Sequence, residues 1–149
     1  MRKGVLTIPK ASGSELNDLL KKNQLSVTGS RKRILELFLV SEGALAHADI
    51  EKMTEEKFDR VTVYRTLQSF MEKGIIHTIP TAGNSIRYAL CKQDCTEGHH
   101  HDNHVHFFCT GCQKTICLDA VTIPTVKLPE GFTPTDRQMI VSGVCEDCR

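Results

Sequence analysis

Two pairs of cysteines have the spacing of a zinc knuckle. In each pair two residues separate the thiols, as Cys109-Thr-Gly-Cys112 and Cys145-Glu-Asp-Cys148. This spacing lets both thiolates of a pair reach one ion at about 2.3 Å, and two such pairs complete a tetrahedron. A redox CxxC motif or small core thiols are the alternatives, but a thiol oxidoreductase would leave the second pair without a role. We therefore predict one closed, structural Zn²⁺ site made of all four cysteines.

A second set of metal donors begins with His104-Val-His106. On a strand, residues i and i+2 share a face, so both imidazoles can approach one ion. His77 and Cys91 lie where the first part of the chain adjoins a polar linker, and they are the further donors we expect. A tetrahedral site of His77, Cys91, His104 and His106 would tie two domains together. Imidazole and thiolate favour Zn²⁺, whereas an oxygen-rich iron site would need carboxylates.

Other possible donors have no assigned role: Cys95, His99, His100, His101, Asp102 and Cys117. They could form a further site, but a solvated polar loop is the simpler interpretation of the histidine triplet. We expect Cys117 to be a small buried residue.

The composition of the chain also points to metal. Its 149 residues include seven Cys and seven His but no Trp, and ten of these fourteen residues lie between Cys91 and Cys117. In a reducing compartment such thiols are more often ligands than disulfides. There is no apolar run long enough for a membrane span and no secretory leader, so we predict a cytoplasmic protein.

Basic residues concentrate in the first part of the chain. Residues 1–90 carry 14 basic and 10 acidic groups, whereas residues 91–149 carry 5 and 8. This mild excess of positive charge favours a nucleic-acid partner for the first part without deciding the matter.

Four helices and a hairpin are predicted in the first part. A short amphipathic helix follows Ser14, and a basic helix runs from the cap Thr28 toward Gly43. A weaker pattern covers residues 48–58, and the clearest helix runs from the cap Asp59 to Gly74. Two strand-like runs at 75–81 and 85–91 then form a hairpin.

This order of elements is the layout of a winged helix-turn-helix, in which the last helix enters the major groove. After a polar linker, the segments 104–109, 115–118 and 137–144 read as strands. We predict an α+β chain with a winged-helix DNA-binding domain over 1–91, a hinge over 92–103 and a small antiparallel-sheet domain over 104–149. The predicted Cys₄ zinc site lies in the last of these.

The order of the motifs resembles the ferric uptake regulator (Fur) family of metal-responsive repressors. The resemblance rests on Leu25-Ser-Val-Thr28 with Arg31, on Thr62-Val-Tyr64-Arg65, on Gly74-Ile-Ile, and on HxH followed by two CxxC pairs. It covers roughly residues 14 to 149, and the combination is specific although each motif alone is not.

The resemblance implies a homodimer in which the C-terminal domain carries the dimer contact and the cysteine site. It further implies that Tyr64 and Arg65, beside Thr62 on the recognition helix, contact bases, and that Arg31 contacts the DNA backbone or minor groove. His77 and Cys91 match the zinc-sensing branch best, because Val105 and Cys117 stand where other branches carry acidic donors. Pro124 and Pro129 fall where the family has a long helix, and they forbid one.

We therefore expect a transcriptional repressor of metal-uptake genes that binds an AT-rich palindromic operator, with zinc as corepressor and Fe²⁺ possible at the regulatory site. Iron- or peroxide-responsive regulation is the alternative within the family. A zinc-buffering or protein-interaction module is the alternative of another class. An enzyme is not expected, and neither is a small-molecule substrate, because the H-x-E with P-C-x-x-C and H-E-x-x-H motifs of zinc enzymes are absent from the sequence.

Overall fold

The computed structural model describes residues 12–41, 43–55, 57–79, 81, 85–91, 104–135 and 137–149, and all of these side chains except those of His104 and Asp119. The predicted hinge over 92–103 lies outside the described residues, and so do Cys95, the histidine triplet and Asp102. The turn of the predicted hairpin, 82–84, lies outside them as well.

The four predicted helices are present. They are α1 (Gly13–Lys22), α2 (Gly29–Val40), α3 (His47–Met53) and α4 (Arg60–Glu72). Thr28 and Asp59 cap α2 and α4, because their side chains accept the backbone N–H of Arg31 and Thr62. The first helix starts earlier than expected, since Ser12 and not Ser14 is its cap and forms a capping box with Glu15.

The third helix is shorter than predicted, and it ends five residues before Phe58. A two-residue strand, β1 (Leu45–Ala46), precedes it and was not predicted. Because Asp49 Oδ2 accepts the backbone N–H of Ala46 at 2.9 Å, the change from strand to helix is fixed at this point.

The wing is a small three-stranded sheet in the order β1-β3-β2. Strand β2 (Ile76–Ile79) pairs antiparallel with β3 (Arg87–Leu90), which confirms the hairpin, and β3 pairs with β1. Gly74 has φ of +68° between α4 and β2, a backbone conformation that favours glycine. The helices and this sheet enclose one apolar core, in which Leu20, Ile34 and Phe70 are fully buried.

The C-terminal sheet has the order β5-β4-β6 and is mixed. Strands β4 (His104–Cys109) and β5 (Thr115–Thr122) are antiparallel as predicted. Strand β6 (Ile140–Gly143), however, runs parallel to β4, which corrects the prediction of an all-antiparallel sheet. The physical reason is the long connection from Ile123 to Met139, which returns the chain to the opposite edge of β4 in the same direction.

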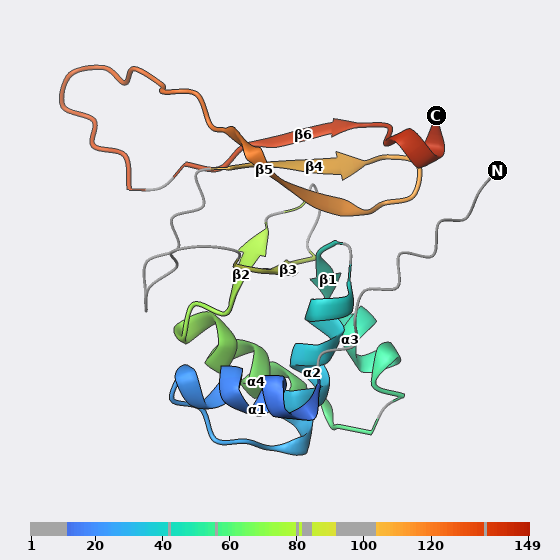
Figure 1. Ribbon diagram of the computed structural model, residues 1–149. Coiled ribbons are helices and arrows are strands. Elements are labelled where there is room, and N and C mark those ends of the chain that lie inside the picture. Colours follow the sequence, from blue (N-terminus) through green and yellow to red (C-terminus); the bar gives the residue numbers. More distant parts are fainter. Residues whose placement is uncertain are drawn as a thin grey trace.

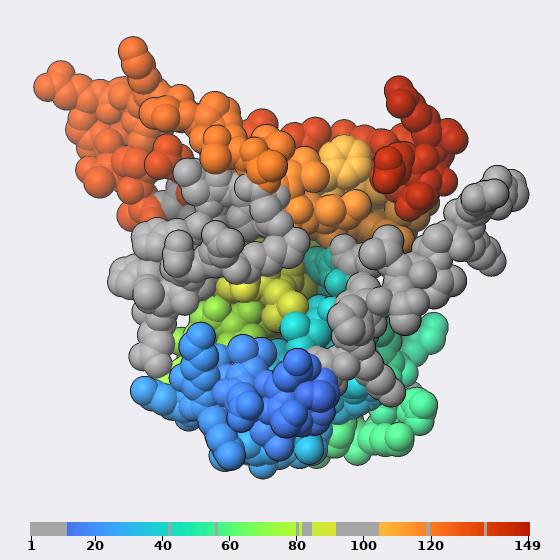
Figure 2. All heavy atoms as spheres, in the orientation of Figure 1, coloured from blue at the N-terminus to red at the C-terminus, as the bar shows by residue number. Residues whose placement is uncertain are grey.

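The described residues between β5 and β6 form neither helix nor strand, as the two prolines predicted. This segment projects beyond the sheet in Figure 1 and, in orange, in Figure 2. It carries exposed apolar side chains, among which Phe132 is 68% exposed.

Figure 1 shows three layers: the helices, the β1-β3-β2 sheet, and the β5-β4-β6 sheet, with the wing sheet in the middle. The two sheets therefore face each other, and the candidate donors of both lie near this junction. No helix among the described residues is long and apolar enough to span a bilayer.

Candidate metal centres

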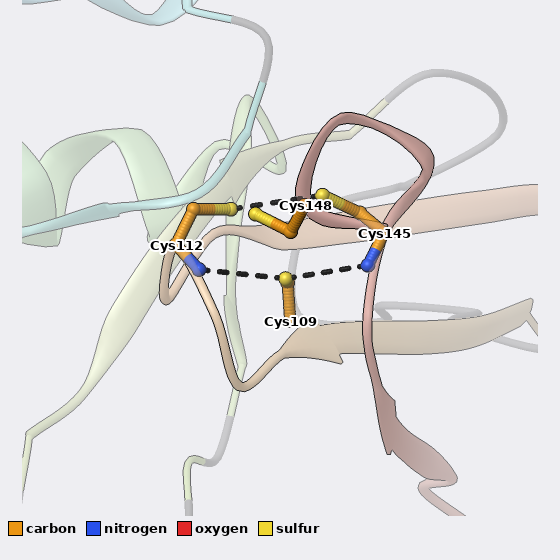
Figure 3. Close-up of side chains that lie close together, drawn as sticks. All are labelled: Cys109, Cys112, Cys145 and Cys148. Atoms are coloured by element: carbon orange, nitrogen blue, oxygen red, sulfur yellow. Dashed lines mark hydrogen bonds between the residues drawn. The ribbon is translucent and has the colours of Figure 1, made fainter.

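The four knuckle cysteines converge at one end of the C-terminal sheet (Figure 3). Cys109 ends β4 and Cys112 follows in the turn toward β5, while Cys145 precedes the short 3₁₀ helix η1 (Glu146–Cys148) and Cys148 ends it. One sulfur from each residue lies within 4.8 Å of the others. The Sγ atoms of Cys112 and Cys145 are 3.8 Å apart, which matches the edge of about 3.8 Å in a tetrahedron with bonds of about 2.3 Å.

The surrounding backbone favours a thiolate at the buried Cys109. The backbone N–H groups of Cys112 and Cys145 donate to its Sγ at 3.5 and 3.3 Å, and they lower the pKa of this thiol to about 6. The hydrogen bond with the Cys145 thiol raises the pKa of Cys148 to about 12. Four thiols this close cannot all ionise alone, so a divalent cation fits the cluster because it offsets their repulsion.

A second cluster joins the two sheets. His77 from β2, His106 from β4 and Cys117 from β5 each place one donor atom within 4.8 Å of the others. The Nε2 atoms of His77 and His106 are 3.4 Å apart, close to the edge of about 3.3 Å expected for two imidazoles on one tetrahedral zinc. Both histidines are buried, at 2% and 3% exposure, so the arrangement is a site shielded from water.

Cys117 belongs to this cluster and is partly buried, whereas the sequence favoured a small buried residue and left a role as a metal ligand as the other possibility. It lies directly opposite His106 in the β4–β5 ladder. Residues that face each other across a ladder place their side chains on the same side of the sheet. His106 lies three residues before Cys109, and Cys117 lies three residues after Lys114. Because Cys109 and Lys114 pair at the ends of the knuckle turn, this equal spacing could indicate the partner once that turn is known.

The structure places the other two predicted donors differently. Cys91 follows β3, and its Sγ lies 3.5 Å from His77 Nδ1, the ring nitrogen that does not face His106. His104 begins β4 opposite Thr122, next to an irregularity in the ladder, and its side chain lies outside the described part. His77 and His106 are therefore brought together as predicted, and Cys91 contacts the far side of the His77 ring.

The predicted DNA contacts lie on two helices of the first domain. Tyr64 and Arg65 are exposed on α4, with Tyr64 at 51%, while Thr62, in the first turn of this helix, is half-buried. Arg31, in the first turn of α2, donates to the backbone oxygen of Ser26 at 3.0 Å. These positions leave the exposed face of α4 accessible to a partner.

Comparison with known proteins gives concordant findings. The family model described as "Ferric uptake regulator family" matches residues 22–140. The ferric uptake regulation protein of Staphylococcus aureus is 30% identical over 137 residues, which cover 88% of this chain and 93% of the relative. This chain belongs to the ferric uptake regulator family. Members of this family are transcription regulators and not enzymes, so the expectation that the chain is not an enzyme is confirmed.

Solved structures of ferric uptake regulators and related proteins share the fold. The Vibrio cholerae ferric uptake regulator superposes with a TM-score of 0.60 at 22% identity, covering 87% of this chain and 98% of that one. A zinc uptake regulator solved with zinc and DNA gives a TM-score of 0.61, also at 22% identity, covering 91% of each chain. The winged-helix domain followed by a small sheet domain is therefore the architecture of this family.

Proposed function

We propose that this chain is a zinc-responsive repressor of metal-uptake genes that binds DNA as a homodimer. The observation that carries the proposal is the convergence of His77 from the wing sheet with His106 and Cys117 from the C-terminal sheet. An ion held by these donors would connect the DNA-binding domain, proposed to span 1–91, to the domain proposed to span 104–149.

The donor types support zinc over iron. The three converging groups are two imidazoles and a thiol, and the Cys91 thiol lies next to them. Soft sulfur with imidazole suits Zn²⁺, whereas carboxylates suit harder ions. The zinc uptake regulator with a similar fold was solved with zinc and DNA, which agrees with this choice.

The second candidate is an iron-responsive regulator of the same family. The names of the relatives favour it, since the Staphylococcus aureus and Staphylococcus epidermidis proteins are called ferric uptake regulation proteins. Under this candidate Fe²⁺ would occupy the same site.

Zinc, when bound, would supply a link between β2 and the β4–β5 pair. His77 would then hold the winged helix at one orientation to the second domain, while Tyr64, Arg65 and Thr62 meet the major groove and Arg31 meets the backbone. Because the ligands come from both sides of the hinge, metal would favour the DNA-binding orientation as much as DNA favours metal. In a homodimer, two such helices about one helical turn apart, roughly 34 Å, would read a palindrome.

The test is a gel shift on an AT-rich palindromic duplex with Zn²⁺, with Fe²⁺ or with a chelator. The His106→Ala variant should keep one structural zinc and lose zinc-dependent binding by roughly ten- to hundredfold. Full zinc-dependent binding by this variant would contradict the proposal, and a shift driven by Fe²⁺ but not by Zn²⁺ would favour the iron-responsive candidate.

The fourth ligand is tested by two further variants, His104→Ala and Cys91→Ser. The sequence prediction included both residues in the site. We propose that the variant that weakens the second zinc as much as His106→Ala identifies the fourth ligand. A residue that does not bind the ion and only orients the His77 ring through Nδ1 should, when replaced, weaken binding of the second zinc less than His106→Ala does.

A further inference from the structure

Strand β5 of the second domain passes close to Gly43, which lies just before β1. A Cβ atom at this position would lie 2.8 Å from the backbone oxygen of Thr115 at the start of β5. The next residue contacts the same oxygen, since the backbone N–H of Ala44 donates to Thr115 O at 3.0 Å. A side chain at position 43 would thus collide with backbone and not with a flexible side chain.

Gly43 is itself held in place. The Ser41 hydroxyl donates to the Gly43 carbonyl oxygen at 2.8 Å and accepts the Gly43 N–H at 3.4 Å. This turn fixes the backbone that leads from α2 into β1. Because a Cβ at this position would press on backbone atoms, either this turn or β5 must shift, and a shift of β5 moves the two domains apart.

The junction is open beside this contact. A cavity of about 460 Å³ lies beside the contact, lined by residues of both domains that include Ser41, Arg87, Gln113 and Thr115. Because the neighbouring space is open, the backbone contact beside Gly43 is one of the contacts that limit how near β5 comes to the wing sheet.

The contact is coupled to the proposed sensor through β5. Cys117 follows Thr115 by two residues and therefore lies on the same face of the strand. It packs against Ala44, which precedes β1, and against Ile79 and Ala89 of the wing sheet, a small apolar cluster between the domains. A displacement of Thr115 would carry Cys117, and the paired His106, away from His77.

We propose that Gly43 is a positioning residue of the regulatory metal centre: it lets β5 dock closely enough on the wing for donors of both domains to reach one ion. This proposal rests on the proposed function, because it needs the centre of His77, His106 and Cys117 to bind metal. Gly43 supplies no donor, and it acts only by lacking a side chain.

The experiment compares Gly43→Ala and Gly43→Val with a matched control, Gly13→Ala, in the full-length chain. A Cβ at Gly13 meets nothing within 4 Å, so the control adds the same methyl group without a collision. Each protein is loaded at the four cysteines and then titrated with Zn²⁺. In parallel, Co²⁺ is used to read the ligand geometry of the second ion from its visible absorption.

We expect Gly43→Ala to lower the affinity for the second ion by roughly tenfold and Gly43→Val to lower it by more. The absorption spectrum of Co²⁺ at this centre should also change. The first zinc should be retained in all variants, and Gly13→Ala should match the wild type. The positioning role is overturned if Gly43→Ala binds the second ion like the wild type. It is also overturned if the variant loses the first zinc as well, which would indicate general unfolding.

A different result distinguishes failure of the proposed function. If the wild-type chain itself takes up no second ion, the sensor is wrong, and the role of Gly43 is overturned with it. If the wild type takes up two ions and all three variants do the same with equal affinity, only the role of Gly43 is wrong.

Discussion

The two candidate metal centres differ in their donors, four thiols against two imidazoles and a thiol, and above all in what they connect. The cysteine centre takes all its ligands from one end of the C-terminal sheet, whereas the His77, His106 and Cys117 centre takes them from two sheets. Loss of an ion from the cysteine centre would unfold part of the C-terminal sheet domain. Loss from the second would free one domain from another and leave both folded. We therefore expect placement, more than ligand chemistry, to make one site structural and the other regulatory.

The largest effect should come from breaking the cysteine centre. In Cys112→Ser, one ligand of the tetrahedron is lost, and we expect the C-terminal sheet to unfold, because structural zinc sites contribute folding free energy outright. Zinc analysis and circular dichroism would check this, with His106→Ala as the matched variant of the other centre. A Cys112→Ser protein with the wild-type melting temperature and DNA affinity would contradict the distinction.

A smaller and more selective effect is expected from Cys117→Asp. A carboxylate is a harder ligand, in the acid–base sense, than the thiolate it replaces in the His77, His106 and Cys117 centre. The preference of this centre for Zn²⁺ over Fe²⁺ should therefore fall by roughly an order of magnitude. Competitive titration of the two ions would measure the change, while the cysteine centre stays loaded with zinc. Cys117→Ala is the control, since it should lower the affinity of this centre for both Zn²⁺ and Fe²⁺.

The zinc affinity of the cysteine centre should also depend on pH. The pKa of Cys148 is raised to about 12 and that of Cys145 is raised as well, whereas the pKa of Cys109 is lowered to about 6. At pH 7 the metal-free cluster therefore carries protons that zinc must displace, so affinity should increase with pH. Calorimetry in buffers of different ionisation enthalpy would count the protons released. Release of no proton at pH 7 would refute this account.

The smallest effect is expected away from both centres, at the cap of α4. The hydrogen bond from the Thr62 backbone N–H lowers the pKa of Asp59 below 3.8, so the cap stabilises the fold above that pH and is lost as pH falls through the folded-state pKa. Asp59→Ala should lower Tm by a few degrees at pH 7 and by less at acidic pH. Thermal melts would measure this, and zinc content should not change. An equal loss of Tm at both pH values would argue against the cap.

Much of this molecule could be predicted from sequence because the relevant signals are local. Caps at Thr28 and Asp59, the hairpin and the CxxC spacing each act within a few residues, and each is present in the structure. The direction of β6 was missed because nothing local records the edge to which a long loop returns. The β1 strand was missed because two residues carry no periodicity.

The bridging centre was only partly predictable for the same reason. Period-two spacing within one strand indicated His104 and His106, but partners across strands depend on register. Cys117 could be recognised as the partner of His106 only from the structure, in which Cys109 pairs with Lys114 and the strands on either side of this turn pair residue by residue. The contact between Gly43 and Thr115 depends on docking between domains, for which no sequence pattern was available.

The parallel pairing of β6 with β4 has a consequence for how the chain matures. A total of 32 residues separate Cys112 from Cys145, so bringing the last strand back to the sheet closes a long loop and costs chain entropy. An ion gripped at both ends acts as a tether across that loop, much as a crosslink would. We expect a newly synthesised chain to add its last strand to the sheet only after it has bound zinc. The zinc supply would then control the amount of folded protein before it controls occupancy of the second metal centre.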